Sequence, residues 1–260
     1  MSNTENTTAL TVLEKNKFEL VPFSADIREI IEEEMDGLGA IPFDIVKIPA
    51  GGGLAFEIPG EKEDEPDVQK QIIGIVVDHH AVNAFWMQDV SEGGNSVPDC
   101  SSSDGKTGIT AQGEVCDCAT CPRNQFGSGK NGVGKACKNM HRVYILQSSN
   151  PVPVILVLPP TSIGGWKNYL GKKIVIRGKR PYQVLTKVTL KKEHSANSNS
   201  DYSVAVFTKV EDLTPAECET IKPITEAIKT ITRSTAVLSN VTAETANFVE
   251  LKDDEELPFN

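Results

Sequence analysis

The hydrophobic residues of this chain fall mainly into short runs, either alternating with polar residues or nearly continuous, which is typical of β-strands. Residues 72–77 are almost entirely β-branched and apolar, which predicts a buried strand that residues 82–87 continue or pair with. We expect further strands at 18–23, 43–48, 54–58, 143–146, 152–158, 173–177, 182–192 and 201–210. Because a polar Ser/Asn turn separates the last two, they are expected to pair as an antiparallel hairpin.

Helix signals are fewer than strand signals. Ser24 is an N-cap candidate for a short helix at 24–35, and the acidic stretch 60–67 is expected to be a surface loop. Thr214 and Glu217 have capping-box spacing, with Pro215 at the first helical position. One helical face then follows, with a bend expected at Pro223: Cys218, Ile221, Ile224, Ile228 and Ile231. Such a pattern favours a mainly β (α+β) fold, an OB-like small β-barrel with peripheral helices.

Residues 91–142 would form an exceptionally long loop unless something internal orders them. Five of the six cysteines fall in this part of the chain: Cys100, Cys116, Cys118, Cys121 and Cys137. Cys118 and Cys121 have the spacing of a zinc knuckle, and Cys100 and Cys137 on either side complete a four-thiolate set. One structural Zn²⁺ per chain would order the segment without an apolar core.

Two questions about these cysteines stay open at the level of sequence. Cys116 is left over, and it either replaces Cys118 as a ligand or lies outside the ligand set. His141 is a further candidate ligand, although a surface role is the simpler interpretation. A redox Cys-x-x-Cys is the competing interpretation, but no βαβ pattern surrounds it. Cys218, on the isoleucine face of its helix, is expected to be a core residue.

Charge is distributed unevenly along the chain. The net charge is −10, yet residues 101–200 hold 15 Lys and Arg against 4 Asp and Glu, or +11. The blocks 1–100 and 201–260 carry −14 and −7. A basic middle between acidic flanks suits a surface that binds a polyanion, although pairing of the basic residues with those flanks is the alternative.

Binding of single strands requires a cationic groove and aromatic faces for the bases, and the basic middle supplies both. Trp166 and Tyr169 are the preferred stacking candidates because Gly164, Gly165 and Lys167 surround them. The expected DNA contacts are Arg123, Lys130, Lys135, Lys138, Arg142, Trp166, Lys167, Tyr169, Lys172, Lys173, Arg177, Lys179, Arg180 and Lys187. Helix-turn-helix and heptad signatures are absent from the sequence, which argues against sequence-specific reading of duplex DNA.

The sequence around these residues resembles a known family. Residues 98–105 (PDCSSSDG), 118–128 (CATCPRNQFGS) and 134–138 (GKACK) are similar to phage and mobile-element single-stranded DNA-binding proteins with a zinc-ribbon-like insert. Residues 158–162, 166–169 and 184–188 resemble downstream stretches of the same family. The resemblance spans about residues 40–210 and implies Cys100, Cys118, Cys121 and Cys137 as zinc ligands. The additional Cys116 departs from that pattern.

The C-terminal end carries a separate signal. Four carboxylates precede a short apolar hook: Asp253, Asp254, Glu255, Glu256, Leu257, Pro258 and Phe259. This tip resembles that of bacterial single-stranded DNA-binding proteins, which implies recruitment of replication or recombination proteins. Here Asn260 follows the Phe, so the terminal carboxylate is displaced by one residue. A merely solubilising acidic tail is the alternative.

These patterns together predict a disordered lead at 1–16, an OB-like nucleic-acid-binding domain at 17–235 with a zinc-binding insert at about 95–142, and a disordered acidic tail at 236–260. No catalytic constellation or phosphate-binding loop is visible, so we do not expect an enzyme. Without an 18-residue apolar run or a signal sequence, we expect a cytoplasmic protein. The predicted function is non-sequence-specific single-stranded DNA binding in phage or mobile-element replication or recombination. The alternatives are a zinc-ribbon transcription or host-takeover factor that binds polymerase or duplex DNA, and an annealing protein or recombination mediator.

Overall fold

The structure is a computed structural model that describes residues 18, 19, 30, 33, 34, 36, 43–62, 65–88, 97–195 and 199–233. The strands are β1 (Ile45–Val46), β2 (Phe56–Lys62), β3 (Glu65–Gln69), β4 (Gln71–Phe85), β5 (Cys100–Ser102), β6 (Thr107–Thr110), β7 (Val115–Asp117), β8 (Lys138–Gln147), β9 (Val154–Leu158), β10 (Val184–Ser195) and β11 (Ser200–Asp212). The helices whose residues are all described are α3 (Pro160–Tyr169) and α4 (Pro215–Thr232). A π-helical turn, η5 (Leu170–Ile174), and a 3₁₀ turn, η6 (Val175–Arg177), continue α3.

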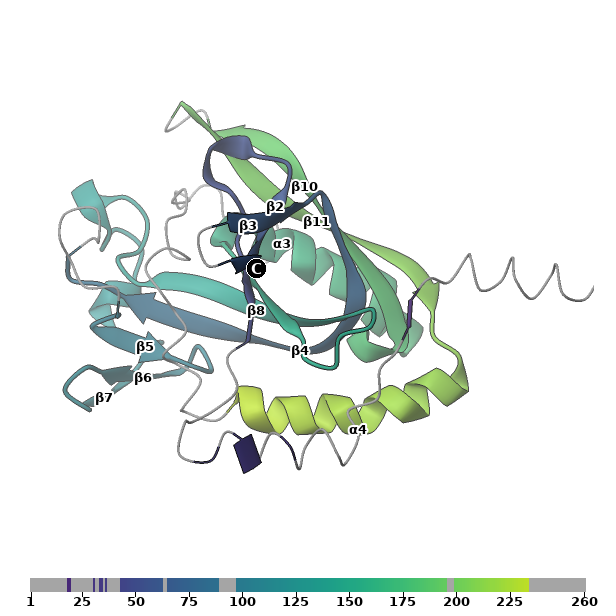
Figure 1. The fold of residues 1–260 in the computed structure, drawn as a ribbon. Helices are drawn as coiled ribbons and strands as arrows, with labels where there is room; N and C mark the ends of the chain where they lie inside the picture. Colours follow the sequence, from purple (N-terminus) through teal and green to yellow (C-terminus); the bar gives the residue numbers. More distant parts are fainter. Residues whose placement is uncertain are drawn as a thin grey trace, which may run out of the picture.

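One large sheet organises the described part of the chain, and the protein is mainly β. Its main path runs β1-β9-β8-β4-β5-β6-β7, and β10 and β11 branch from it at β4 (Figure 1). The branch exists because β4 is 15 residues long, so that two other strands can pair with different parts of one of its edges. Its first part, Gln71–Ile75, pairs with β10, whereas Asn83–Phe85 pairs with β5. The β10–β11 hairpin and the cysteine-bearing strands therefore extend from different parts of one strand.

Strand residues alternate between the two faces of the sheet, so both faces carry apolar side chains. A helix covers each of them. On one face, Ile221, Ile224 and Ile228 of α4 pack in a core with Tyr144 and Leu185. On the other face, which curves around α3 (Figure 1), the core contains Trp166 and Tyr169 of α3. The Thr214 capping box is confirmed: Glu217 N donates to Thr214 Oγ1 (3.3 Å) and Thr214 N donates to Glu217 Oε2 (2.7 Å).

The sheet is open in its hydrogen bonding within the described ranges. Strand β11 pairs only with β10, and its outer edge meets α3 and the turn η1 (Ala50–Gly52). Ala205 N donates to Ser162 Oγ (3.0 Å), and Ser203 Oγ donates to the carbonyls of Pro49 (2.9 Å) and Gly53 (2.8 Å). Side-chain hydrogen bonds thus cover an edge that a closed barrel would pair with another strand.

Several expected elements differ from the structure. Residues 173–177 are the helical turns η5 and η6 and not a strand, because Ile174 is buried by the helical continuation of α3. The expected loop at 60–67 instead belongs largely to the β2–β3 hairpin. Residues 72–77 and 82–85 belong to one strand, β4, which ends before residues 86 and 87. Helix α3 was not anticipated, although Pro160 stands at its first helical position. The lead 1–16, nearly all of the helix at 24–35 and the tail 236–260 lie outside the described residues.

Candidate metal centre and basic surface

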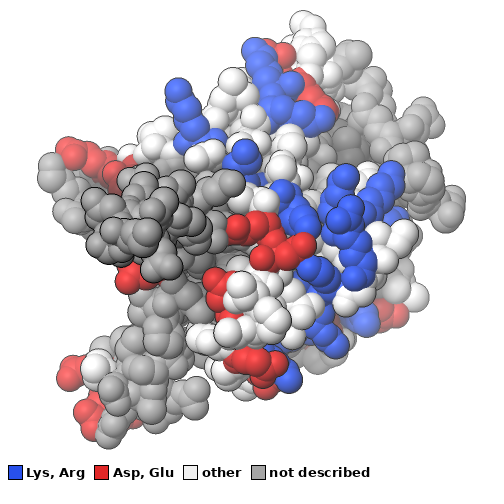
Figure 2. All heavy atoms as spheres, turned by 90° about the vertical axis from the view of Figure 1, so that its right-hand side faces the viewer, with Lys and Arg blue, Asp and Glu red and all other residues white. Residues whose placement is uncertain are grey.

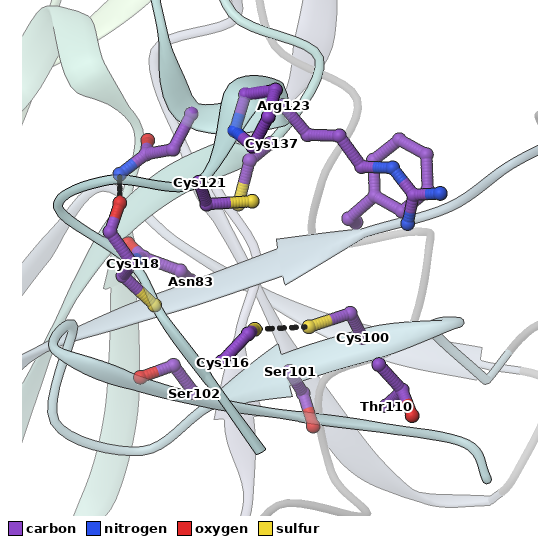
Figure 3. A pocket seen from close by; sticks show the side chains of 13 residues that line it. Asn83, Cys100, Ser101, Ser102, Thr110, Cys116, Cys118, Cys121, Arg123 and Cys137 are labelled. Carbon is purple, nitrogen blue, oxygen red and sulfur yellow. Dashed lines mark hydrogen bonds between the residues drawn. The ribbon is translucent and has the colours of Figure 1, made fainter. Parts of the chain in front are cut away.

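Four segments bring five cysteines to one place. Cys100 begins β5, Cys116 is the middle residue of β7 and Cys118 follows that strand. Cys121 precedes a 3₁₀ turn, Pro122–Asn124, and Cys137 lies directly before β8. All five line one cavity of about 330 Å³, together with residues that include Asn83, Phe85 and Arg123 (Figure 3). Cysteines separated by up to 37 positions in the sequence therefore share one pocket.

The turn between β5 and β6 shows how the local sequence builds this insert. Asp104 Oδ1 accepts hydrogen bonds from the backbone N of Lys106 (2.7 Å) and of Thr107 (2.8 Å), and from Ser102 Oγ (3.0 Å). Gly105 follows with a φ of +72°, a left-handed conformation that glycine adopts without a steric penalty. A short polar turn, held by hydrogen bonds to the Asp104 carboxylate, thus connects β5 and β6.

The cysteine loop is held by backbone hydrogen bonds. Cys118 N donates to Lys106 O (2.7 Å), and Cys137 N donates to Arg123 O (2.8 Å). Asn124 Nδ2 donates to Cys118 O (2.7 Å), which ties the knuckle to the turn that follows it. These bonds fix the backbone at Cys118 and Cys137, whose side chains line the cavity.

Three sulfur atoms converge above Gly108 of β6. A Cβ atom added to Gly108 would lie 2.7 Å from Cys116 Sγ, 3.2 Å from Cys100 Sγ and 3.6 Å from Cys118 Sγ. Cys100 Sγ and Cys116 Sγ are 3.9 Å apart. Gly108 is not in the left-handed region, so its lack of a side chain matters for space and not for backbone conformation.

Electrostatics in the pocket disfavour bare thiolates. Burial raises the pKa of the Cys137 thiol to about 12, and the neighbouring cysteines add to the effect. Burial also raises the pKa of Cys100 to about 12, with a contribution from the hydrogen bond to Cys116. A divalent cation would reverse this balance, because it offsets the negative charge of several thiolates at once.

The donor set fits zinc. Tetrahedral Zn–S bonds of about 2.3 Å place two sulfurs about 3.8 Å apart, close to the 3.9 Å between Cys100 and Cys116. Among the described residues, no three Cys, His, Asp or Glu side chains already form a complete metal-binding group. The structure therefore gathers the thiols around a pocket without fixing four of them at ligand positions.

Cys100 and Cys116 are free thiols in the structure and do not form a disulfide. Their strands, β5 and β7, are not neighbours but flank β6. The two sulfur atoms lie 3.9 Å apart, whereas an S–S bond is about 2.05 Å long.

His141 faces away from this pocket. His141 Nε2 lies 3.0 Å from His79 Nδ1, and the His79 ring packs edge-on against Trp166, with ring centroids 5.2 Å apart. Burial lowers the pKa of both histidines to about 4. Cys218 lies on α4, half-buried, where its thiol meets Leu213 O at 3.9 Å. Neither residue belongs to the cysteine centre.

Three of the predicted DNA contacts are buried, which corrects the prediction. Trp166 (2% exposed) and Tyr169 (5%) pack against Phe207 in the core, and Tyr169 is hydrogen-bonded to Thr186. Arg142 (2%) is two residues from Tyr144 on β8, and so lies on the face of the sheet that α4 covers. The glycines at 164 and 165 are therefore not a sign that Trp166 is exposed. Gly165 lets α3 pass close to β11, because a Cβ added to it would lie 3.3 Å from the Ala205 carbonyl oxygen.

The other predicted basic contacts are accessible to different degrees. Arg123 lies over the Phe85 ring (4.2 Å) and Lys135 over the Phe126 ring (4.7 Å), and Lys179 pairs with Asp212. Half-buried side chains are Lys135, Lys138, Lys179 and Lys187. Exposed side chains are Arg123, Lys130, Lys167, Lys172, Lys173, Arg177 and Arg180.

Five of the exposed cations come from one continuous stretch, residues 167–180, which we call the basic segment. They are Lys167, Lys172, Lys173, Arg177 and Arg180, and none forms an ion pair with a described residue. Val175 (61% exposed) and Ile176 (78% exposed) project from the same stretch. Figure 2 shows Lys and Arg side chains gathered on the side of the molecule that lies to the right in Figure 1.

The sequence interpretation missed Gly108, Val175 and Ile176. Nothing in the local sequence around Gly108 marks it, because its role depends on three sulfurs that come from other segments. Val175 and Ile176 were assigned to a strand on β-branching alone. The partner-binding tip, Asp253 to Phe259, lies outside the described residues.

Comparison of the chain with models of protein families, with curated proteins and with solved structures finds no match in any of the three. None of the described helices is long and apolar enough to cross a membrane.

Proposed function

We propose that this protein binds single-stranded DNA without sequence preference, in phage or mobile-element replication or recombination. The observation that carries the proposal is the basic segment, whose five exposed cations have no acidic partner among the described residues. Other lysines are paired with carboxylates: Lys192 pairs with Asp201, and Lys209 with Asp212. Cations without such partners are available for phosphates, which dominate non-specific binding.

Bases need apolar faces as well as phosphate contacts. Because Trp166 and Tyr169 are buried, the proposal transfers this role to Val175 and Ile176, which lie between Lys173 and Arg177. Exposed apolar side chains flanked by cations can contact or separate neighbouring bases. Phe126, 40% exposed beneath Lys135, offers a second such face on the cysteine insert.

The metal is part of the proposal as a structural ion. Zn²⁺ would be held by Cys100, Cys121 and Cys137, with Cys118 or Cys116 as the fourth ligand. A closed thiolate site contributes folding free energy and has no open position for a substrate, so we propose no enzymatic activity. Its task would be to hold the segment between Cys121 and Cys137, which carries Arg123 and Phe126.

The remaining expectations are also part of this proposal. The proposal that the fold is OB-like is supported by the curved sheet and the long β10–β11 hairpin. Among the described residues the strands form an open sheet and not a closed barrel. The acidic tip would recruit replication or recombination proteins in the cytoplasm, and the support for this is the sequence of residues 253–259.

The proposal is tested by measuring binding of oligo(dT) and of duplex DNA of equal length across a salt series. We expect the single strand to bind more tightly. In Lys172→Gln/Lys173→Gln/Arg177→Gln, the slope of log K against log salt should fall by about 2, since each single-strand phosphate contact contributes about 0.7.

Lys191→Gln/Lys192→Gln is the matched control, because those lysines already pair with Glu193 and Asp201. Its slope should stay close to that of the wild type. Tighter binding to duplex would favour the zinc-ribbon transcription or host-takeover factor instead. No binding at low salt would end both nucleic-acid proposals.

A further inference from the structure

The cysteine centre holds one thiol more than a tetrahedral ion uses. Five cysteines line the pocket, whereas structural zinc takes four ligands. They enter from four segments: Cys100 from β5, Cys121 from the turn after the knuckle, Cys137 from the start of β8, and both Cys116 and Cys118 from β7 and its continuation. Only the β7 segment contributes two.

Cys116 and Cys118 present their sulfurs to the same place. Residues two apart on an extended strand point to the same face. Accordingly, both sulfurs lie against Gly108, 2.7 Å and 3.6 Å from the position of an added Cβ. Cys118 is buried (5% exposed), while Cys116 is half-exposed.

Each of the two thiols also lies near other members of the centre. Cys116 Sγ is 3.9 Å from Cys100 Sγ, the separation of two ligands on one zinc ion. Cys118 shares the corner above Gly108 with Cys100, and its CxxC spacing joins it to Cys121. Figure 3 shows the Cys116 and Cys118 side chains on the same side of the pocket, below Cys121 and Cys137.

We propose that Cys116 and Cys118 are alternative ligands for one position of the metal, while Cys100, Cys121 and Cys137 occupy the other three. The inference rests on the proposed metal centre. The ion then moves between a buried and a more exposed fourth thiolate and keeps four thiolates in both states. Loss of either Cys116 or Cys118 leaves the coordination number unchanged.

Cobalt substitution tests the proposal, because the sulfur-to-cobalt charge-transfer absorption reports the number of bound thiolates. Cys116→Ser and Cys118→Ser should each bind about one metal per chain with the four-thiolate spectrum of the wild type. The double variant should lose about a quarter of the charge-transfer intensity, the share of one thiolate in four. Cys121→Ser and Cys137→Ser are the matched controls and should each resemble the double variant.

A wild-type spectrum in only one of Cys116→Ser and Cys118→Ser would overturn the exchange, because one thiol would then be the fixed ligand. A full-intensity double variant would overturn it as well. If the wild type binds no metal, the proposed metal centre itself fails, which is a different outcome.

Alkylation of the zinc-loaded wild type gives a second measurement that does not depend on the folding of variants. Limited N-ethylmaleimide treatment followed by peptide mass spectrometry should place the pocket label on both Cys116 and Cys118, at the expense of the other three. Label on Cys116 alone, or on Cys100, Cys121 or Cys137, would contradict the proposal.

Discussion

Gly108 lies beneath the cysteine centre, where any side chain would enter space that three sulfurs share. The nearest, Cys116 Sγ, would be 2.7 Å from an added Cβ, inside the contact distance of real Cβ atoms. Since Gly108 has no left-handed φ, a substitution there acts through crowding alone. Its effect on the metal can therefore be separated from backbone strain.

We expect Gly108→Ala to lower metal affinity by about 10- to 100-fold, the usual cost of disturbing groups that orient metal ligands. Competition with a chromophoric chelator measures the change. Gly171→Ala is the control, because an added Cβ there meets nothing within 4 Å and its φ is ordinary. Equal affinities of the two variants would contradict the role of Gly108.

At the scale of elements, a buried carboxylate fastens the end of α4 to the sheet. Asp78 of β4 accepts hydrogen bonds from Thr232 Oγ1 (2.8 Å), Arg233 Nη2 (2.8 Å) and His80 Nδ1 (3.1 Å). Burial alone would raise the pKa of Asp78, but these hydrogen bonds hold it well below its usual range. The C-terminal end of α4 is thus tied to the core.

Asp78→Ala should reduce the free energy of unfolding by about 3 kcal/mol, the lower end for a buried ion pair, because the Arg233 side chain is half exposed. Urea unfolding followed by circular dichroism measures the loss. Asp212→Ala, which removes an exposed carboxylate between Lys179 and Lys209, should change stability little. A similar loss in both variants would argue against the special role of Asp78.

The β-branched residues near the end of α3, at 173–177, form helical turns and not a strand. Residues 170–177 follow α3 directly, and the helical continuation buries Ile174 beside Trp166 and Tyr169. Val175 and Ile176 then point outward among the cations. Burial of one face of the turn outweighs a strand propensity that spans only about 1 kcal/mol.

For the whole molecule, the paired histidines beneath α3 set the response to acid. The pKa of His79 and of His141 is lowered to about 4 in the folded state, mainly by burial, from the ordinary value of 6.5. The unfolded chain therefore binds more protons between these values. Stability is full above about pH 6.5 and falls as the pH decreases toward 4.

One histidine shifted in this way contributes a loss of about 3 kcal/mol, since each pKa unit corresponds to about 1.4 kcal/mol. Melting temperatures measured from pH 7 to pH 4 should fall steeply in the wild type and less steeply in His79→Leu/His141→Leu. His194→Leu, which changes an exposed histidine on β10, is the control and should follow the wild type. Parallel curves for the double variant and the wild type would exclude the pair as the cause.

The local sequence was enough to predict those features that depend on interactions between residues close together in the chain. Alternation between apolar and polar residues located β10 and β11 and their antiparallel pairing, and the spacing of Thr214 and Glu217 located the start of α4. The clustering of five cysteines within 38 residues predicted that they share one site, because a segment rich in Gly and Ser has little apolar surface to order it otherwise. The basic residues 167–180 were likewise visible as a charge pattern.

Only the tertiary structure decided which side chains are buried and which sulfurs meet. Trp166 lies in the core because Phe207 and His79, both far away in the sequence, pack against its ring at 4.8 Å and 5.2 Å. Cys116 joins the other thiols because β5, β6 and β7 stand side by side with a glycine beneath the sulfurs. Burial depends on long-range packing, and a local pattern contains no information about the partner that provides it.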